Sequence, residues 1–338
     1  MFETALMNPD AYPEKTKEVS LVQTHISFVF ITDNYVYKIK KPVNFGFLDF
    51  STLEKRKYYC EQEVILNRRT APDIYVGVLP RLSNGIKVII SNFQIPHSEF
   101  QIIDYAVKMK RLPLEYLMKN RLERGDLSPE HIRRIARAIA DFHKNANTSN
   151  VIESFGLPEN IRKNTVENFE QTKKYIGITI SEELYKKIKE WTEQYYIHNE
   201  NIFKERIAEK KIRDCHGDIH MEHVFITDEH VLLFDCIEFN DRFRYSDVAS
   251  DIAFLAMDLD FHGQFDYSDS LIKYYSEFMA DNTLSTVLLF YKVYRAYVRG
   301  KVNSFLLSDP YISKEKKEYH KRIAMKYFQL INRYIDTD

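Results

Sequence analysis

One short segment concentrates side chains that can move a proton or bind a metal ion. Residues 214–225 read DCHGDIHMEHVF. The side chains in question are Asp214, His216, Asp218, His220, Glu222 and His223. Such a cluster is typical of a metal site or of a catalytic loop, and an ordinary polar turn is the alternative.

A further acidic residue stands at a spacing that phosphoryl transfer uses. The reaction needs a lysine on the phosphates, a carboxylate that faces the acceptor hydroxyl, and ligands for a divalent metal. In protein kinases a metal-binding residue follows the catalytic Asp by five positions, and a second Asp lies on the next hairpin. Here His223 lies five positions after Asp218, and Asp235 ends the apolar run VLLFD, 17 residues after Asp218. The spacing matches a phosphotransfer loop.

Two other kinds of metal site fit the same residues less well. The tetrapeptide GDIH resembles the start of a two-metal phosphoesterase site, but such a site needs further carboxylate, Asn and His blocks, and the sequence has no GNH block. A zinc site of His216, His220 and His223 lacks the Cys pair or HExxH motif that usually accompanies it.

The segments that must position these residues begin with a strand-rich part. Runs of β-branched and aromatic residues, bounded by turn residues, predict strands. They cover residues 25–31, 35–41, 74–82, 86–93 and 104–112. One helix is predicted among them, over residues 51–69, opened by a capping box of Ser51 and Glu54.

After this part the apolar spacing becomes helical. Residues 128–145 place apolar side chains on one helix face, with Pro129 in the first turn. Those side chains are Ile132, Ile135, Ala136, Ile139 and Phe142. Two short strands, HVFIT and VLLFD, are predicted near residue 230, and helices follow from residue 247. The sequence therefore predicts an α+β protein of two lobes, over residues 1–110 and 111–338, with the boundary near Met109–Pro113.

Composition and charge exclude several classes of protein. The 338 residues are 44% hydrophobic and 29% charged, as in ordinary globular proteins. Lys and Arg number 48 against 49 Asp and Glu, without the basic excess usual for nucleic-acid binding. We find no CxxC pair, no signal-peptide pattern and no membrane-length apolar run. We expect a cytoplasmic protein without nucleic-acid or membrane partners, and the oligomeric state stays open.

Several blocks resemble the aminoglycoside phosphotransferase family and its choline-kinase-like relatives. The resemblance rests on the HGD loop at 216–218 and on residues 23–56, 104–113, 234–263 and 294–302. Together these blocks look like the branch described only as aminoglycoside phosphotransferase-like. The resemblance implies a bilobal protein-kinase-like fold and an ATP- or GTP-dependent phosphotransferase. Its acceptor would be an alcohol group, and its metal Mg²⁺ or Mn²⁺.

The resemblance also implies roles in the catalytic loop. Asp218 would take the proton from the acceptor hydroxyl, His216 would position the loop, and Asp235 would chelate Mg²⁺. Where this sequence has His223 the family commonly has Asn. An Asn carbonyl suits Mg²⁺, whereas imidazole suits Mn²⁺, Zn²⁺ or Ni²⁺ better. His223 is therefore either a metal ligand that favours Mn²⁺ or a loop residue that binds no metal.

In the first lobe the resemblance implies a nucleotide site. Lys38 matches the phosphate-binding lysine, and Lys40, on the same strand face, is the alternative. Glu63 would be its carboxylate partner, with Glu61 as the alternative. The hinge that meets the base would include Met109, Lys110 and Leu112. Where many kinases have glycines this sequence reads QTHISFVF, so Thr24, His25 and Ser27 would cover the triphosphate.

In the second lobe the resemblance implies structural and acceptor residues. Asp247 and Asp251 fit a structural signature, and Asp247 is expected to brace the catalytic loop. The acceptor candidates are Asp258, Asp260, His262, Tyr294, Arg295, Arg299 and Lys301. The acidic groups would suit a polyol or an amino sugar, and the arginines an anionic acceptor. No APE block follows Asp235, which favours a small-molecule acceptor over a Ser/Thr protein. A kinase-shaped nucleotide-binding protein without turnover is the remaining alternative.

Overall fold

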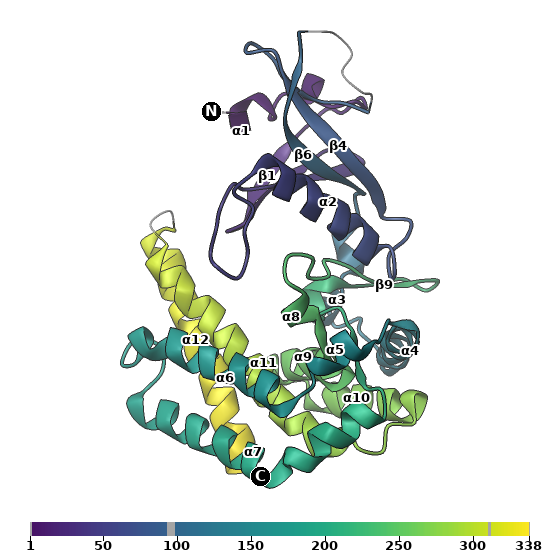
Figure 1. Cartoon of the computed structure of the whole chain (residues 1–338). Helices are drawn as coiled ribbons and strands as arrows, with labels where there is room; N and C mark the ends of the chain where they lie inside the picture. Colours follow the sequence, from purple (N-terminus) through teal and green to yellow (C-terminus); the bar gives the residue numbers. More distant parts are fainter. Residues whose placement is uncertain (1, 93–98, 310–311, 338) are drawn as a thin grey trace.

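Two lobes of unequal size make up the chain. The computed structural model describes residues 2–92, 99–309 and 312–337. The smaller lobe holds a twisted sheet and one main helix, and the larger lobe is mainly helical (Figure 1). The predicted α+β bilobal fold is confirmed. The last strand of the large sheet ends at Lys110, and helices begin soon after it.

The described residues form a six-stranded antiparallel sheet in the order β1-β2-β3-β6-β4-β5. Its strands are β1 (Ser20–Gln23), β2 (Ser27–Ile31), β3 (Tyr35–Lys40), β4 (Tyr75–Ser83), β5 (Val88–Ile90) and β6 (Gln101–Lys110). The predicted strands correspond to β2 to β6, and Phe93, at the end of one prediction, lies outside the described residues. Strand β1 was not predicted, since its residues are largely exposed and show no apolar alternation.

The register of β2 and β3 decides which side chains lie on each face of the sheet. Phe28, Phe30, Tyr37 and Ile39 are buried on the outer face against the N-terminal segment. Because side chains alternate along a strand, the opposite face of β3 carries Lys38 and Lys40. The pairing of Val29 with Lys38 and of Ser27 with Lys40 fixes that arrangement. A shift by one residue would bury the lysines in the apolar core.

Helix α2 (Leu53–Asn67) packs on the face of the sheet that carries the lysines. Its N-cap is Thr52, whose hydroxyl accepts the N–H of Lys55 at 3.3 Å. The predicted capping box at Ser51 is therefore wrong by one residue. The physical reason is local, because the Ser51 hydroxyl donates to the Asp49 carboxylate at 2.6 Å.

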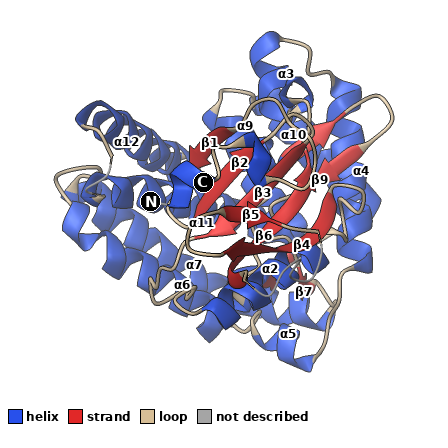
Figure 2. Ribbon diagram, turned by 90° about the horizontal axis from the view of Figure 1, so that it is seen from above, coloured by secondary structure: helices blue, strands red, loops and turns tan. Residues whose placement is uncertain are grey.

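The helical lobe is built around one almost fully buried helix, α9 (Val248–Phe261), which packs against α10 and α11. The other longer helices are α3 (Met118–Arg124), α4 (Pro129–Asn145), α6 (Pro158–Thr172), α7 (Glu182–Ala208), α10 (Phe265–Met279), α11 (Leu284–Phe305) and α12 (Lys314–Asp336). The short helices are α1 (Phe2–Ala5), α5 (Asn150–Ser154) and α8 (Asp241–Arg244). The predicted apolar face of α4 is buried. Seen from above, α6, α7, α11 and α12 lie to one side of the sheet and α3 and α4 to the other (Figure 2).

Two small antiparallel sheets of two strands each hold the loops that carry the predicted chemistry. Strand β7 (Ile212–Asp214) pairs with β10 (Tyr245–Asp247), and β8 (Val224–Ile226) pairs with β9 (Val231–Leu233). Residues 215–220 connect β7 to the 3-10 turn Met221–His223, and Asp235 follows β9 by two residues. Of the described helices, none combines the length and apolar character needed to cross a membrane.

Candidate active site

Lys38 joins the two lobes through two carboxylates. Its Nζ lies 2.9 Å from Oε1 of Glu63 and 2.7 Å from Oδ1 of Asp235. Burial alone would lower the pKa of Lys38, but the two carboxylates outweigh it and raise that pKa well above its usual value. Glu63 is fully buried, whereas the Asp235 side chain is 41% exposed. The structure thus brings together a lysine, its helix carboxylate and the predicted metal ligand, and the last of these is accessible to solvent.

The alternative lysine, Lys40, lies in the same network but deeper in the protein. Its Nζ is 2.7 Å from Oε2 of Glu63 and also hydrogen bonds to Glu238. Lys40 is 1% exposed and Glu238 6%. Glu61, the alternative carboxylate, is about half exposed and its nearest ion-pair partner is Lys57. Lys38 therefore reaches the partly exposed Asp235, while Lys40 is an internal partner of Glu63.

Glu238 was missed by the sequence analysis. A signal for it did exist: two lysines on one buried strand face need at least two carboxylates, because an unpaired buried charge is costly. Glu238 stands three residues after Asp235, next to a residue already assigned to the site.

The predicted catalytic loop, residues 216–218, is held by one hydrogen bond within the loop and by bonds to Phe234 and Asp251 outside it. The Nδ1 atom of His216 accepts the N–H of Asp218 at 3.3 Å, and its Nε2 donates to the carbonyl of Phe234 at 3.1 Å. The N–H groups of His216 and Gly217 donate to the Asp251 carboxylate at 2.7 and 2.9 Å. His216 is buried, and burial lowers its pKa to about 4, so the ring is neutral near pH 7.

Gly217 occupies a position that other residues cannot take without strain. Its φ is +86°, in the left-handed region. A Cβ atom there would lie 2.7 Å from the carbonyl oxygen of Phe243. The turn that exposes Asp218 therefore depends on glycine at this position.

The brace of the loop is Asp251, and the expectation that Asp247 braces it is wrong. Asp247 instead forms a bidentate ion pair with the buried Arg206 and caps α9 by accepting the N–H of Ala249. Asp251 lies one turn further along α9, where its carboxylate reaches the loop. His143 and Arg295 lie on the other sides of this carboxylate, at 3.3 and 3.7 Å.

His223 connects the two predicted acidic residues. Its Nδ1 lies 2.9 Å from the backbone carbonyl oxygen of Asp218 and 3.4 Å from the Asp218 carboxylate. Its Nε2 lies 3.5 Å from Oδ2 of Asp235. A carbonyl oxygen can only accept, so Nδ1 carries the hydrogen. Burial lowers the pKa of His223, so in the neutral ring Nε2 presents a lone pair to the Asp235 carboxylate.

This arrangement fits a divalent cation bound by His223 and Asp235. A lone pair and a carboxylate oxygen that face each other repel unless a cation or a proton lies between them. Asp218, His220 and His223 also form a compact group of potential ligands. There, however, Nδ1 of His220 accepts the N–H of Glu222, so the nitrogen that faces Asp218 carries a hydrogen. The zinc site considered from the sequence also includes His216, which lies outside this group and whose two ring nitrogens bond to the N–H of Asp218 and the carbonyl of Phe234. A site at His223 and Asp235 is therefore better supported.

The predicted hinge residues lie at the end of β6. Met109 pairs with Val36 and Tyr75 inside the sheet. The N–H of Lys110 donates to the carbonyl of Ile74 at 2.9 Å. The Leu112 side chain packs in an apolar cluster that includes Leu232 and Phe234 of the helical lobe. Within the described part of the chain, the N–H of Leu112 makes no hydrogen bond.

The predicted phosphate loop is the tight turn between β1 and β2. The N–H of Thr24 donates to the carbonyl of Ser27 at 2.9 Å, so the turn spans four residues. Ser27 is fully buried opposite Lys40, and its hydroxyl has no hydrogen-bond partner among the described residues. His25 at the tip lies 3.4 Å from Asp309, which follows α11.

Three acceptor candidates are engaged inside the helical lobe. Asp258 accepts the N–H of Met221 at 2.9 Å. Asp260 accepts from Lys292 at 2.9 Å and from Tyr334. Arg295 donates to the carbonyl of Gly217 at 2.9 Å.

Arg299 differs from those three. Its Nε donates to the Tyr327 hydroxyl at 3.3 Å, and its other guanidinium nitrogens bond to none of the described residues. Its charge is near enough to Asp218 to help hold the pKa of that carboxyl well below its usual range, together with His220 and His223 and against the effect of burial.

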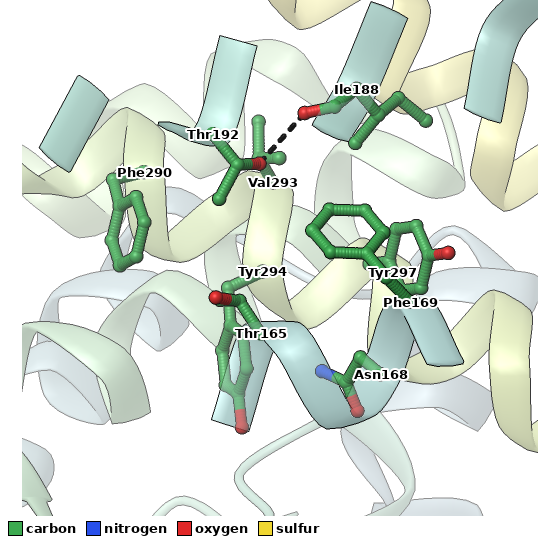
Figure 3. Close-up of a pocket in the computed structure, with 9 residues that line it drawn as sticks. All are labelled: Thr165, Asn168, Phe169, Ile188, Thr192, Phe290, Val293, Tyr294 and Tyr297. Atoms are coloured by element: carbon green, nitrogen blue, oxygen red, sulfur yellow. Dashed lines mark hydrogen bonds between the residues drawn. The ribbon is translucent and has the colours of Figure 1, made fainter. Parts of the chain in front are cut away.

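The remaining candidates lie on the same helices. His262 hydrogen bonds to the carbonyl of Asp258 at 2.8 Å, and Lys301 donates to Asn168 and Gln171. Tyr294 lines a cavity of about 10 Å³ between α6, α7 and α11 (Figure 3). That volume suits a single water molecule, and the cavity is separate from the catalytic loop.

Known proteins were compared with the chain by sequence and by structure. No family model matches the chain. Uncharacterised proteins of Mycobacterium bovis and Mycobacterium tuberculosis are 29% identical over 303 residues, which are 89% of this chain. The chain spans 58% of the length of these curated relatives.

Solved structures align over nearly the whole chain. A choline kinase from Cryptosporidium parvum has a TM-score of 0.58 at 14% identity, covering 99% of this chain and 96% of that one. The chain has the fold of choline kinase. An amicoumacin kinase in complex with AMP-PNP, Ca²⁺ and Ami has a TM-score of 0.51 at 10% identity, covering 97% and 92% of the two chains. A choline/ethanolamine kinase family protein from Mesorhizobium loti has a TM-score of 0.50 at 10% identity, covering 98% and 99%.

At these identities the likeness to the choline kinase is one of fold. The resemblance inferred from the sequence is confirmed at that level.

Proposed function

We propose that the protein transfers the γ-phosphoryl group of ATP or GTP to a hydroxyl of a small molecule. The observation that carries the proposal is the link from Lys38 to Asp235 across the lobes, together with the link from Asp235 through His223 to Asp218. The names of the structural neighbours, choline kinase and amicoumacin kinase, support the same reaction class.

Each charged residue has a distinct task in this proposal. Lys38 binds the phosphates, and Glu63 fixes its ammonium group. Asp218 orients the acceptor hydroxyl and accepts its proton, and its low pKa keeps the carboxylate ionised at neutral pH. His216 and Asp251 hold the loop so that the Asp218 carboxylate keeps its position.

Asp235 and His223 would hold the divalent metal, Mg²⁺ or Mn²⁺. When bound, such an ion neutralises charge on the phosphate oxygens. The orientation of its ligands does not depend on the ion, because Lys38 fixes one oxygen of Asp235 and the Asp218 carbonyl fixes the ring of His223.

The base and the phosphates would contact the side of the first lobe that carries Lys38. The N–H of Leu112, which follows Met109 and Lys110 at the end of β6, would meet the base. Thr24, His25 and Ser27 of the β1–β2 turn would lie over the triphosphate. The N–H groups of Thr24, Ile26 and Ser27 already donate within the turn, which leaves the N–H of His25 for the phosphates.

The acceptor would lie between Asp218 and Arg299. Arg299 offers free N–H donors there, whereas Asp258, Asp260 and Arg295 would act by holding the loop and the helices. A sugar, amino sugar or polyol is the class we propose, because such acceptors offer several hydroxyls to one charged donor and one carboxylate.

A screen of hydroxyl-bearing metabolites tests the proposal. ATP consumption is measured with the purified protein in Mg²⁺ and in Mn²⁺, and ³¹P NMR identifies a phosphorylated product. We expect acceptor-dependent consumption that the Asp218→Asn variant loses. If the protein binds no nucleotide and consumes none with any acceptor, the proposal is wrong.

A nucleotide-binding protein without turnover is the second candidate. It is favoured by the β1–β2 turn, Thr24–Ser27, which contains no glycine. In that case the wild type would bind an ATP analogue, and neither the wild type nor the Asp218→Asn variant would consume ATP.

A further inference from the structure

We propose that His223 makes the metal site of this protein select Mn²⁺ over Mg²⁺, through direct coordination by Nε2 beside Oδ2 of Asp235. The inference rests on the proposed function, since it concerns the metal of the same site. It goes further by naming the coordinating atoms and the order of metal preference.

The first step is the orientation of the His223 ring. Nδ1 donates to the Asp218 carbonyl at 2.9 Å, and this bond fixes both the tautomer and the direction of the ring. Nε2 is therefore the free nitrogen, and it points toward Asp235. A histidine held through its other nitrogen by a carbonyl is the arrangement typical of metal-binding histidines in proteins.

The second step is the orientation of Asp235. Its Oδ1 is bound by Lys38 at 2.7 Å, and its N–H donates to the Tyr75 hydroxyl at 3.1 Å. Its φ is +61°, a left-handed conformation that is uncommon outside glycine and often marks a functional position. These constraints leave Oδ2 as the oxygen that faces His223.

The third step is the distance between the two atoms. Nε2 and Oδ2 are 3.5 Å apart, which is longer than an ordinary hydrogen bond. Ligand atoms of one small divalent ion, each about 2.1 Å from it, lie roughly 3–3.5 Å apart. The separation therefore suits two adjacent ligands of one ion without a change in backbone position.

The fourth step is the chemistry of the donors. Mg²⁺ prefers oxygen ligands and gives up its water reluctantly, so a site with one imidazole and one carboxylate offers it little. An imidazole ligand increases the affinity of a site for divalent transition-metal ions, and Mn²⁺ accepts both nitrogen and oxygen ligands. The pair of His223 and Asp235 should therefore bind Mn²⁺ more tightly than Mg²⁺.

Electron paramagnetic resonance of Mn²⁺ tests the inference directly. The protein is mixed with a methylene-bridged ATP analogue, which brings no nitrogen between its phosphates, and ¹⁴N modulation of the bound Mn²⁺ signal is recorded. The same samples give Mn²⁺ affinity, and Mg²⁺ affinity follows from competition. The variants are His223→Asn and, as a matched control, His230→Asn, whose ring is 70% exposed in the turn between β8 and β9.

We expect ¹⁴N modulation in the wild type and in His230→Asn, and its loss in His223→Asn. We also expect the ratio of Mn²⁺ affinity to Mg²⁺ affinity to fall at least about tenfold in His223→Asn. Tenfold is the lower end of the loss in metal affinity when residues that only contact the ligands are changed, and His223 would itself be a ligand. Absence of ¹⁴N modulation in the wild type, or an unchanged preference in His223→Asn, would overturn the inference.

A thermal melt of His223→Asn shows whether the variant is folded, and Asp235→Asn supplies a second test in which Mn²⁺ binding should be lost. The failure of this inference is distinguishable from failure of the proposed function. If the analogue does not bind, the proposed function fails, and Mn²⁺ with the nucleotide-free protein still reports the ¹⁴N coupling. If the analogue binds and ATP is turned over without ¹⁴N coupling, only the inference fails.

Discussion

Replacing each of the two lysines of β3 by methionine should separate a catalytic lysine from a structural one. Lys40→Met leaves Glu63 and Glu238 without their shared cation, and these carboxylates are 0% and 6% exposed. Removing one partner of a buried pair costs about 3–5 kcal/mol. At about 2 °C per kcal/mol for a chain of this size, the melting temperature should fall by roughly 6–10 °C.

Lys38→Met should lose little stability and most of the turnover. The Lys38 side chain is 13% exposed and its partner Asp235 41%, so water replaces part of the lost interaction. We expect a stability loss of about 1–2 kcal/mol and a fall in turnover of orders of magnitude, because the ammonium group on the phosphates is gone. Lys40→Met should keep measurable turnover at temperatures where it is folded.

Denaturant unfolding and ATP turnover of the two variants, measured side by side, check this. Burial raises the pKa of Glu238 even beside Lys40, so without Lys40 this carboxyl binds a proton more readily. A raised pKa in the folded state means that stability is lost as pH rises. The cost of Lys40→Met should therefore be smaller at pH 5.5 than at pH 8, and Glu238→Gln should recover part of it in the double variant. The reasoning is refuted if Lys40→Met abolishes turnover at little cost in stability while Lys38→Met remains active.

Three further predictions concern the catalytic loop. Asp251→Ala removes the acceptor of two loop N–H groups, so we expect a stability loss of about 2–4 kcal/mol and a larger loss of turnover than in Asp247→Asn, measured by unfolding and ATP consumption. Gly217→Ala should be strained by its φ of +86° and by the Phe243 carbonyl, and turnover should fall with nucleotide affinity retained in a titration. His216 has a pKa of about 4 in the folded protein and about 6.5 when unfolded, so the unfolded state binds one more proton between these values and stability falls as pH falls through them. His216→Gln should lower the slope of unfolding free energy against pH by about one proton in that range, and an unchanged slope would contradict the burial of a neutral ring.

Much of the fold could be predicted from local pattern. Strands β2 and β3 and helix α4 follow from alternation and from helical spacing, because each buries one face. Strand β1 could not be predicted in this way, since it is an edge strand with little to bury. The N-cap of α2 is one residue later than predicted, because the hydroxyl of Ser51 hydrogen bonds to Asp49, outside the helix.

The site could be predicted where residue type and spacing determine chemistry. Asp218 and Asp235 were chosen on that basis, and Lys38 came from the resemblance, with Lys40 as the alternative. The structure brings Lys38 and Asp235 into contact. Residues whose role depends on tertiary packing were assigned wrongly or missed. Asp247 and Asp251 differ by one helical turn, and only the packing of α9 against the loop decides which one reaches it.

The central claim is that Asp218 acts on the acceptor hydroxyl beside a nucleotide held at Lys38 and Asp235. The side-by-side measurement of nucleotide affinity and ATP turnover in Asp218→Asn tests it most directly. Loss of a general base should lower turnover by about a hundredfold to ten-thousandfold, while affinity for a non-hydrolysable ATP analogue stays within about twofold of the wild type. If affinity and turnover fall together, or if turnover is unchanged, Asp218 does not act on the acceptor and the account is contradicted.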